Sequence, residues 1–123
     1  MWLFTRYGFY SAACASKPSG TADPAKMMVR SRLRSHLENL RNRFPGLAQT
    51  EIVHLAGRDY RWRMFVDKQQ WAAIVAELVE EQGWSNFKNE AQRHLGKTGS
   101  AYIHALHDVW QIMSELQGTE TTP

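Results

Sequence analysis

Residues 60–66 read Tyr60-Arg61-Trp62-Arg63-Met64-Phe65-Val66, so that two arginines are spaced two residues apart in an otherwise apolar stretch. This composition, rich in aromatic and branched side chains, is typical of a β-strand. Alternate side chains of a strand point to the same face of a sheet. Such a strand therefore carries both guanidinium groups on one face and apolar side chains on the other.

The same spacing occurs in a second stretch, Met27-Met28-Val29-Arg30-Ser31-Arg32. If the two strands are neighbours, one sheet face turns Val29, Trp62 and Met64 towards the core. The opposite face then gathers Phe65 with four arginines, namely Arg30, Arg32, Arg61 and Arg63. Arginines beside aromatic side chains suit a ligand that carries phosphate, and nucleic acid in particular. The alternatives are a solvated sheet face, arginines paired with acidic side chains on the C-terminal helices, or a register shifted by one residue.

The remaining sequence alternates strand and helix patterns around these two segments. We expect strands at 9–15, 27–32, 51–55 and 60–66, helices at 35–44 and between Asp67 and Gly83, and two later helices at 86–95 and 101–116. Residues 2–8 also resemble a strand, which we expect to break near Gly8. A loop is expected at about 16–26, where Gly, Ser and Pro are frequent.

The order of these elements predicts an α+β fold. We expect a four-stranded antiparallel or mixed sheet in a permuted ferredoxin-like ββαββα sandwich, followed by two C-terminal helices. The expected strand order is 1-2-4-3, with the second and fourth strands adjacent and parallel at the centre of the sheet. Right-handed connections would place both main helices on one face.

Length and composition indicate an ordinary globular protein. The 123 residues are 43% hydrophobic and 22% charged, and we expect one domain over 1–116 followed by a disordered tail at 117–123. No apolar run approaches the roughly 20 residues that a membrane-spanning helix needs. We therefore expect no membrane association. Cys14 is the only cysteine, which favours a reducing, cytoplasmic location.

The charges are unevenly distributed along the chain. Residues 1–63 contain eleven Lys and Arg against four acidic residues, whereas residues 64–123 contain four against eight. The basic part includes both arginine pairs, which favours an anionic partner for that part.

Other candidate site residues lie in the C-terminal part. Asn86 and Lys88 follow Ser85 at the start of an expected helix, where free backbone N–H groups favour an anion; the alternative is a simple helix cap. His104 and His107 have a spacing that metal ligands can have, but no further ligand pattern accompanies them, and we assign no metal or cofactor. No nucleophile or phosphate-loop motif occurs, so no catalytic residue is assigned.

Two functional hypotheses follow, and an enzyme is the least favoured class. The first is a non-enzymatic module that binds an anion or nucleic acid through the arginine-bearing sheet face. The second is an interaction protein that forms a homodimer or binds a partner protein. Its basis is a dense aromatic cluster near the N-terminus, namely Trp2, Phe4, Tyr7, Phe9 and Tyr10.

Several short motifs resemble a family of small uncharacterised bacterial proteins that carry a domain of unknown function. The motifs are Trp2-Leu3-Phe4-Thr5, Gly8-Phe9-Tyr10-Ser11, Val29-Arg30-Ser31-Arg32, Asp59-Tyr60-Arg61-Trp62-Arg63, Asn86-Phe87-Lys88 and His107-Asp108-Val109-Trp110. The resemblance implies a single-domain bacterial cytosolic protein. It assigns no functional residue.

Overall fold

The computed structural model describes residues 1–120 of the chain. The chain divides into two compact units, a first unit of Met1–Gly83 and a second unit that begins at Trp84. The domain predicted over 1–116 therefore includes residues of both units, and each unit is described by itself. Of the predicted tail, residues 117–119 belong to the 3-10 helix η3 (Glu115–Thr119), and residues 121–123 lie outside the described residues.

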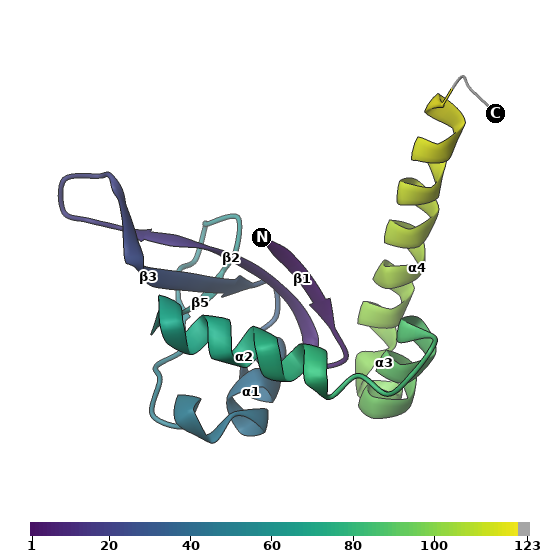
Figure 1. Ribbon diagram of the computed structural model, residues 1–123, viewed down its shortest axis with the longest axis horizontal. Coiled ribbons are helices and arrows are strands. Elements are labelled where there is room, and N and C mark those ends of the chain that lie inside the picture. Colours follow the sequence, from purple (N-terminus) through teal and green to yellow (C-terminus); the bar gives the residue numbers. More distant parts are fainter. Residues whose placement is uncertain (121–123) are drawn as a thin grey trace. The chain divides into compact units, whose positions relative to one another are not determined.

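The first unit contains a five-stranded sheet in which all paired neighbours are antiparallel. Its strands are β1 (Trp2–Thr5), β2 (Gly8–Ser16), β3 (Ala22–Ser31), β4 (Val53–His54) and β5 (Trp62–Asp67), and their spatial order is β1-β2-β3-β5-β4 (Figure 1). The four predicted strands correspond to β2, β3, β4 and β5, so their predicted order is found. The protein thus has the predicted mixed α+β class, with one more strand than expected.

The predicted parallel pairing at the centre of the sheet is wrong, because β3 and β5 are antiparallel. The reason lies in the connection between them. The helix that follows β3 leads first to β4, and the β4–β5 hairpin then reverses the chain direction before β5 enters the sheet. The name ferredoxin-like stays a prediction.

The expected break near Gly8 is a tight turn between β1 and β2. The Thr5 hydroxyl donates to the carbonyl of Gly8 at 2.9 Å and accepts from the backbone N–H of Tyr7 at 3.1 Å. His36 packs so closely that a Cβ at Gly8 would lie 2.3 Å from its Cγ atom. Gly8 also has a φ of 153°, so both space and backbone conformation require glycine.

The loop predicted at about 16–26 is shorter than expected. Strand β2 continues to Ser16 and β3 begins at Ala22, so that only residues 17–21 connect them. Cross-strand pairing of Ser16 with Ala22 and of Ala15 with Asp23 extends the hairpin into the predicted loop, with a shift of register after Cys14. This shift of register accommodates a Pro-containing segment that sequence composition indicated as loop.

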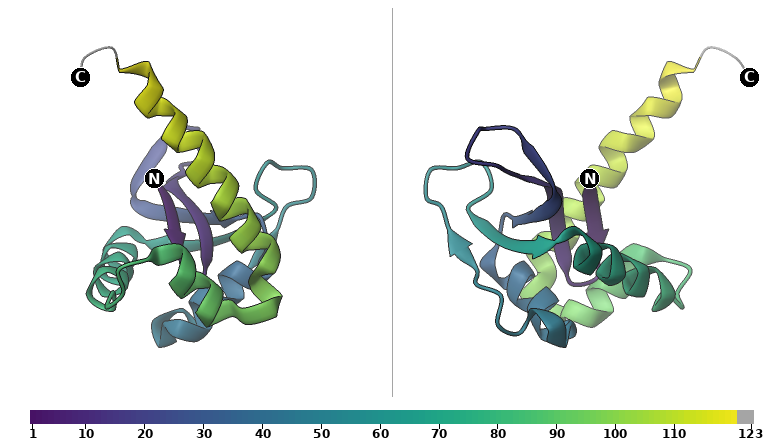
Figure 2. Two further views of the ribbon diagram at one scale, coloured as in Figure 1. Left: turned by 90° about the vertical axis from the view of Figure 1, so that its right-hand side faces the viewer. Right: turned by 60° about the vertical axis from the view of Figure 1, so that its left-hand side comes forward.

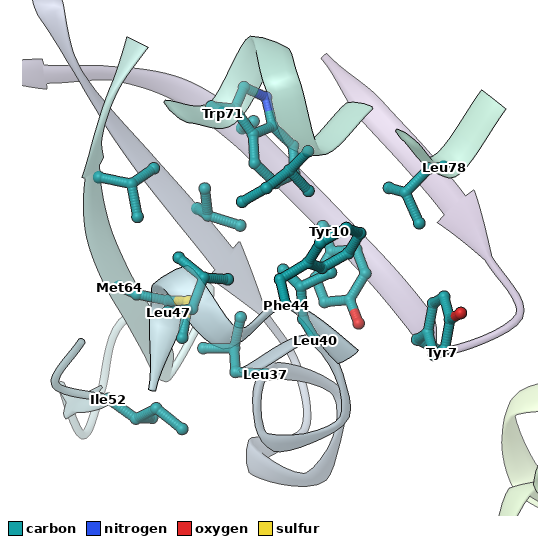
Figure 3. Packing of buried hydrophobic residues seen from close by; sticks show 14 residues of the cluster. Tyr7, Tyr10, Leu37, Leu40, Phe44, Leu47, Ile52, Met64, Trp71 and Leu78 are labelled. Atoms are coloured by element: carbon teal, nitrogen blue, oxygen red, sulfur yellow. The ribbon is translucent and has the colours of Figure 1, made fainter. Parts of the chain in front are cut away.

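Two helices, α1 (Arg34–Arg43) and α2 (Lys68–Glu80), cover one face of the sheet (Figure 2, right). A short 3-10 helix, η1 (Pro45–Leu47), follows α1. Figure 3 shows the core between these layers, in which the sheet contributes Tyr10, Val29 and Met64 and the helices contribute Leu37, Leu40, Trp71, Ile74 and Leu78. Each such apolar side chain contributes about 1.5–3 kcal/mol of burial free energy before conformational entropy is subtracted. This packing determines which face of the sheet the helices cover. The candidate site lies on the opposite face.

The second unit contains α3 (Phe87–Leu95), the 3-10 helix η2 (Gly96–Gly99) and α4 (Ser100–Ser114), followed by η3. Ala91 of α3 and Tyr102 and Leu106 of α4 are buried. Within the part of the chain that the structure describes, no helix has the length and apolar character that crossing a membrane requires.

Candidate nucleic-acid interface on the open sheet face

The face of the sheet opposite α1 and α2 is called the open face here, and its centre is an arginine pair. Arg30 of β3 and Arg63 of β5 are direct cross-strand partners. Their sequence neighbours Val29 and Met64 are completely buried in the core, so strand alternation points both arginines to the open face. The two arginines occupy the neighbouring positions that their spacing predicted.

Arg30 is held by the adjacent strand and by an aromatic ring. Its Nη2 donates to the Ser11 hydroxyl at 2.8 Å, and Ser11 is its cross-strand partner on β2. Its guanidinium carbon lies 4.8 Å from the centroid of the Tyr60 ring, within the range of a cation–π interaction. These contacts orient the group but do not neutralise its charge.

Arg63 is partly desolvated. Its Nη1 donates to the Met28 sulfur at 2.9 Å, and its Nε is buried with no hydrogen-bond partner among the described residues. Burial lowers the pKa of the Arg63 guanidinium below its usual value, and the charges of Arg30 and Arg58 lower it further. Over residues 1–120, no ion pair joins Arg30 or Arg63 to an acidic side chain.

The other two predicted arginines differ from this pair. Arg32 forms an ion pair with Asp59, with 2.8 Å between Nη1 and Oδ1, and its guanidinium lies 4.1 Å from the Tyr60 ring centroid. The hydrogen bond to Asp59 raises the pKa of Arg32. Arg61 is exposed just before β5, and its carbonyl accepts from Leu55 N–H at 2.7 Å. Arg32 is thus paired internally, but with an acidic side chain of the turn before β5 and not with one on the C-terminal helices, as the alternative had it.

An aromatic cluster extends from the arginine pair towards β1. Phe9 stacks on Phe4 with 4.6 Å between ring centroids, meets Trp2 edge-on at 6.0 Å and lies 6.4 Å from Tyr60. The Trp2 side chain is 70% exposed. Cross-strand pairing of Phe4 with Phe9 and of Trp2 with Ser11 places these rings and Arg30 on the same face. The open face therefore joins two uncompensated cations to a row of rings.

Two residues of this site were missed by the sequence analysis, namely Arg58 and Tyr60. Strand alternation would point Tyr60 to the same side as Trp62 and Met64, but residues 56–60 form bends and a turn rather than a strand. Its ring consequently reaches Arg30, Arg32 and Phe9. The sequence did contain a signal for this turn, namely the glycine in Ala56-Gly57-Arg58-Asp59. The turn carries an arginine of its own, Arg58, beside the arginines of the strands.

The remaining predicted site residues, Asn86 and Lys88, belong to the second unit. The Asn86 side chain caps α3 by accepting from the backbone N–H of Asn89 at 2.9 Å, so the helix is capped one residue later than at the predicted Ser85. Lys88 Nζ lies 3.2 Å from His107 Nδ1. No group of three or more His, Cys, Asp or Glu side chains that could hold a metal occurs among the described residues.

Comparison with protein-family models, with curated proteins and with solved structures finds no match for the chain. The residues of the open face and their geometry are therefore the basis for assigning a function. Membership of the bacterial family indicated by the short motifs stays a prediction.

Proposed function

We propose that the first unit binds single-stranded nucleic acid on the open face of its sheet, without chemical conversion of the ligand. In this proposal Arg30 and Arg63 contact the phosphate backbone. The aromatic cluster of the open face, which consists of Trp2, Phe4, Phe9 and Tyr60, stacks against unpaired bases. Guanidinium groups remain protonated near neutral pH, and aromatic rings supply neither a base nor a nucleophile. The face is suited to holding a ligand.

The observation that carries the proposal is the cross-strand pairing of Arg30 with Arg63 without a neutralising carboxylate. Like charges directly opposite each other on neighbouring strands destabilise a sheet. Burial of the Arg63 Nε without a partner adds a further cost. A phosphate beside the two guanidinium groups would offset the repulsion between them, because it supplies negative charge and strong hydrogen-bond acceptors.

The aromatic cluster favours nucleic acid over a simple anion. A base has a flat face that stacks on an exposed ring, and such stacking contributes about 1–3 kcal/mol per base. Trp2 is 70% exposed at one end of the cluster, and Phe65, on the same face of β5 as Arg63, is 40% exposed. Single strands are favoured over duplexes because only unpaired bases can stack in this way.

A labelled oligonucleotide tests this proposal directly. Fluorescence anisotropy would follow the binding of single-stranded RNA, single-stranded DNA and duplex DNA of equal length over a range of salt concentrations. The double variant Arg30→Gln/Arg63→Gln should weaken binding of single strands about tenfold or more. It should also reduce the slope of log K against log salt by about 1.4, because two phosphate contacts are lost.

A matched control removes the same charge elsewhere in the first unit. Arg34 and Arg41 lie on α1, on the covered side of the sheet, where Arg34 pairs with Glu38 and Arg41 donates to the Thr50 carbonyl. The variant Arg34→Gln/Arg41→Gln should retain binding close to that of the parent. Equal losses of affinity in both double variants would show that binding depends only on net charge. That result would contradict a defined binding site.

Self-association through the N-terminal strand is the second candidate function. The observation that favours it is that β1 is an edge strand whose Trp2 side chain is largely exposed. Light scattering over a range of concentrations would detect a dimer, and Trp2→Ser should then shift the protein to the monomer. A monomer at all concentrations would contradict this second function.

We also propose that the first unit is a permuted ferredoxin-like sandwich with an added edge strand, in a bacterial cytoplasmic protein. The strand order β2-β3-β5-β4 and the two helices on one face support the fold assignment. The short motifs and the single, unpaired Cys14 support the source and location. An experimental structure of the first unit and fractionation of the producing cell would test these two assignments.

A further inference from the structure

A groove lies between α3 and α4, entirely within the second unit, and it shares no residue with the open face. Its volume is about 690 Å³. Its polar lining consists of Lys88 and Gln92 from α3, Lys97 from η2, and Ser100, His104 and His107 from α4. Ile103 contributes an apolar part of the wall. All of these side chains other than Ile103 carry a hydrogen-bond donor, and none is a carboxylate.

Helical spacing explains why these side chains converge. Lys88 and Gln92 are four residues apart on α3, and Ser100, His104 and His107 follow one another at four and three residues on α4. Residues at these spacings share one face of a helix. The two donor-bearing faces therefore line the same groove.

Two glycines bring the two helices together. Gly96 has a φ of 60° and ψ of −145°, a conformation that other residues rarely adopt, and it ends α3. At Gly99, a Cβ would lie 2.4 Å from the Leu95 Cβ, so any side chain there would push α4 away from α3. The turn between α3 and α4 therefore allows the two helices to lie close together. The groove depends on this close approach.

The charge of the groove points to an anionic ligand. Lys88 Nζ is within 3.2 Å of His107 Nδ1, and Lys97 lies on the connecting turn. The Ser100 hydroxyl and the Gln92 amide add uncharged donors to this cationic lining. Cationic side chains together with hydroxyl and amide donors match the three acceptor oxygens of a phosphomonoester.

The exposed ring of Trp110 lies beside these cationic side chains and indicates that the ligand also has an aromatic part. Trp110 is 64% exposed and follows the groove residue His107 by three positions on α4. Its ring stacks on that of His107 with 5.9 Å between centroids, and Lys88 Nζ is 6.0 Å from its centroid. A volume of about 690 Å³ is far larger than a free phosphate needs and falls within the usual range for small organic ligands. We propose that this groove binds a mononucleotide, with its phosphate at Lys88, Lys97 and His107 and its base against Trp110.

The test uses the full chain in an Arg30→Gln/Arg63→Gln background, in which the open face no longer contributes phosphate contacts. Isothermal titration with adenosine 5′-monophosphate should show saturable binding. Ribose 5-phosphate and inorganic phosphate should bind more weakly, and adenosine should not bind. Adding Lys88→Gln and Lys97→Gln should weaken the nucleotide affinity about tenfold or more, because charge-assisted hydrogen bonds are lost.

Two further variants separate the phosphate and base contacts. Trp110→Ala should weaken binding of the nucleotide but leave the affinity for inorganic phosphate unchanged. Lys68→Gln, on α2 of the first unit, removes the same charge outside the groove and should leave both affinities unchanged. Circular dichroism would confirm that each variant retains the helix content of the parent.

Three results would overturn the inference: no saturable nucleotide binding, equal affinity with and without the two groove lysines, or equal affinity for adenosine and its phosphate. None of them bears on the oligonucleotide experiment, which depends on Arg30 and Arg63 in the other unit. Conversely, if the oligonucleotide experiment shows no binding, the nucleotide titration still tests the groove independently.

Discussion

Arg30 and Arg63 face each other across neighbouring antiparallel strands, on the sheet face that no helix of the first unit covers. Neither guanidinium forms an ion pair in the described part of the chain, and the Arg63 pKa is lowered by burial and by Arg30 and Arg58. A purely structural role would favour an acidic partner at one of the two positions. The pair is therefore a cost to stability that a bound anion can offset.

Replacing Arg63 with methionine should make the folded protein more stable. The change Arg63→Met keeps an extended apolar stem but removes the like charge opposite Arg30 and the unpartnered buried Nε. We expect the free energy of unfolding to rise by about 1 kcal/mol. Urea denaturation at low salt would measure the change.

The control for this experiment is Arg61→Met, two residues earlier on an exposed side chain. It should change stability by less than about 0.5 kcal/mol. Addition of phosphate should stabilise the parent protein more than Arg63→Met. A destabilised Arg63→Met would show that the guanidinium has a favourable structural role and would count against the argument from uncompensated charge.

The buried imidazole of His36 should make stability sensitive to acid. His36 is 6% exposed, and its Nδ1 accepts from the backbone N–H of Phe9 at 3.2 Å. Burial lowers the pKa of His36 from 6.5 to about 4. Because the unfolded chain binds the proton more readily, the contribution of His36 is fully present above pH 6.5 and is lost as the pH falls towards 4. The loss should approach about 3 kcal/mol.

Two measurements isolate His36 from the acidic groups that titrate in the same range. A ring titration followed by NMR should give a midpoint near pH 4 for His36. The slope of unfolding free energy against pH between 6.5 and 4 should decrease in His36→Gln. An ordinary midpoint for His36 would contradict its burial as a neutral acceptor.

Gly8 should not tolerate even the smallest side chain. In Gly8→Ala the new Cβ would collide with the His36 ring at a backbone position with positive φ. We expect a loss of at least about 2 kcal/mol of stability, measured by thermal or urea unfolding. Gly83→Ala introduces the same methyl group where no atom lies within 4 Å, and it should be nearly neutral. Similar effects of the two substitutions would exclude close packing of His36 as the cause.

Glu81 should be more important for stability than its sequence neighbour Glu80. Its Oε2 accepts from the Tyr7 hydroxyl and from Arg43 Nε, each at 3.0 Å, and its side chain is only 12% exposed. This carboxylate ties the β1–β2 turn to both helices of the first unit. Glu81→Gln removes the charge between these partners and should cost about 1–3 kcal/mol, whereas the exposed Glu80→Gln should cost much less. Urea denaturation of both variants provides the comparison, and equal stabilities would contradict the role assigned to the cluster.

Side-chain periodicity made the central part of the site predictable from sequence. A strand has a period of two, and the apolar positions Val29 and Met64 must face the core. Once both strands are in the sheet, Arg30 and Arg63 have only the other face available. The strand order was predictable for a related reason, since few arrangements of four strands and two helices cover a single sheet face.

The parts that sequence did not predict depend on chain reversals and local turns. The direction of β5 relative to β3 is set by the β4–β5 hairpin, in which β4 has only two residues and gives almost no periodic signal. The alternation of side chains in β5 also ends at the turn before this strand. This alternation therefore could not predict that the Tyr60 ring lies against Arg30 and Arg32. Neutralisation of Arg32 by Asp59 arises from the same turn.

Mapping of an unlabelled single-stranded oligonucleotide onto the isotope-labelled full chain by NMR tests the central claim most directly. The account predicts that the side-chain Nε–H signals of Arg30 and Arg63 and the ring signals of Phe9 and Tyr60 shift together and saturate at one common concentration. Signals of Arg34 and Arg41 on α1 should remain in place. Shifts that spare Arg30 and Arg63, or that spread evenly over all cationic side chains, would contradict the account.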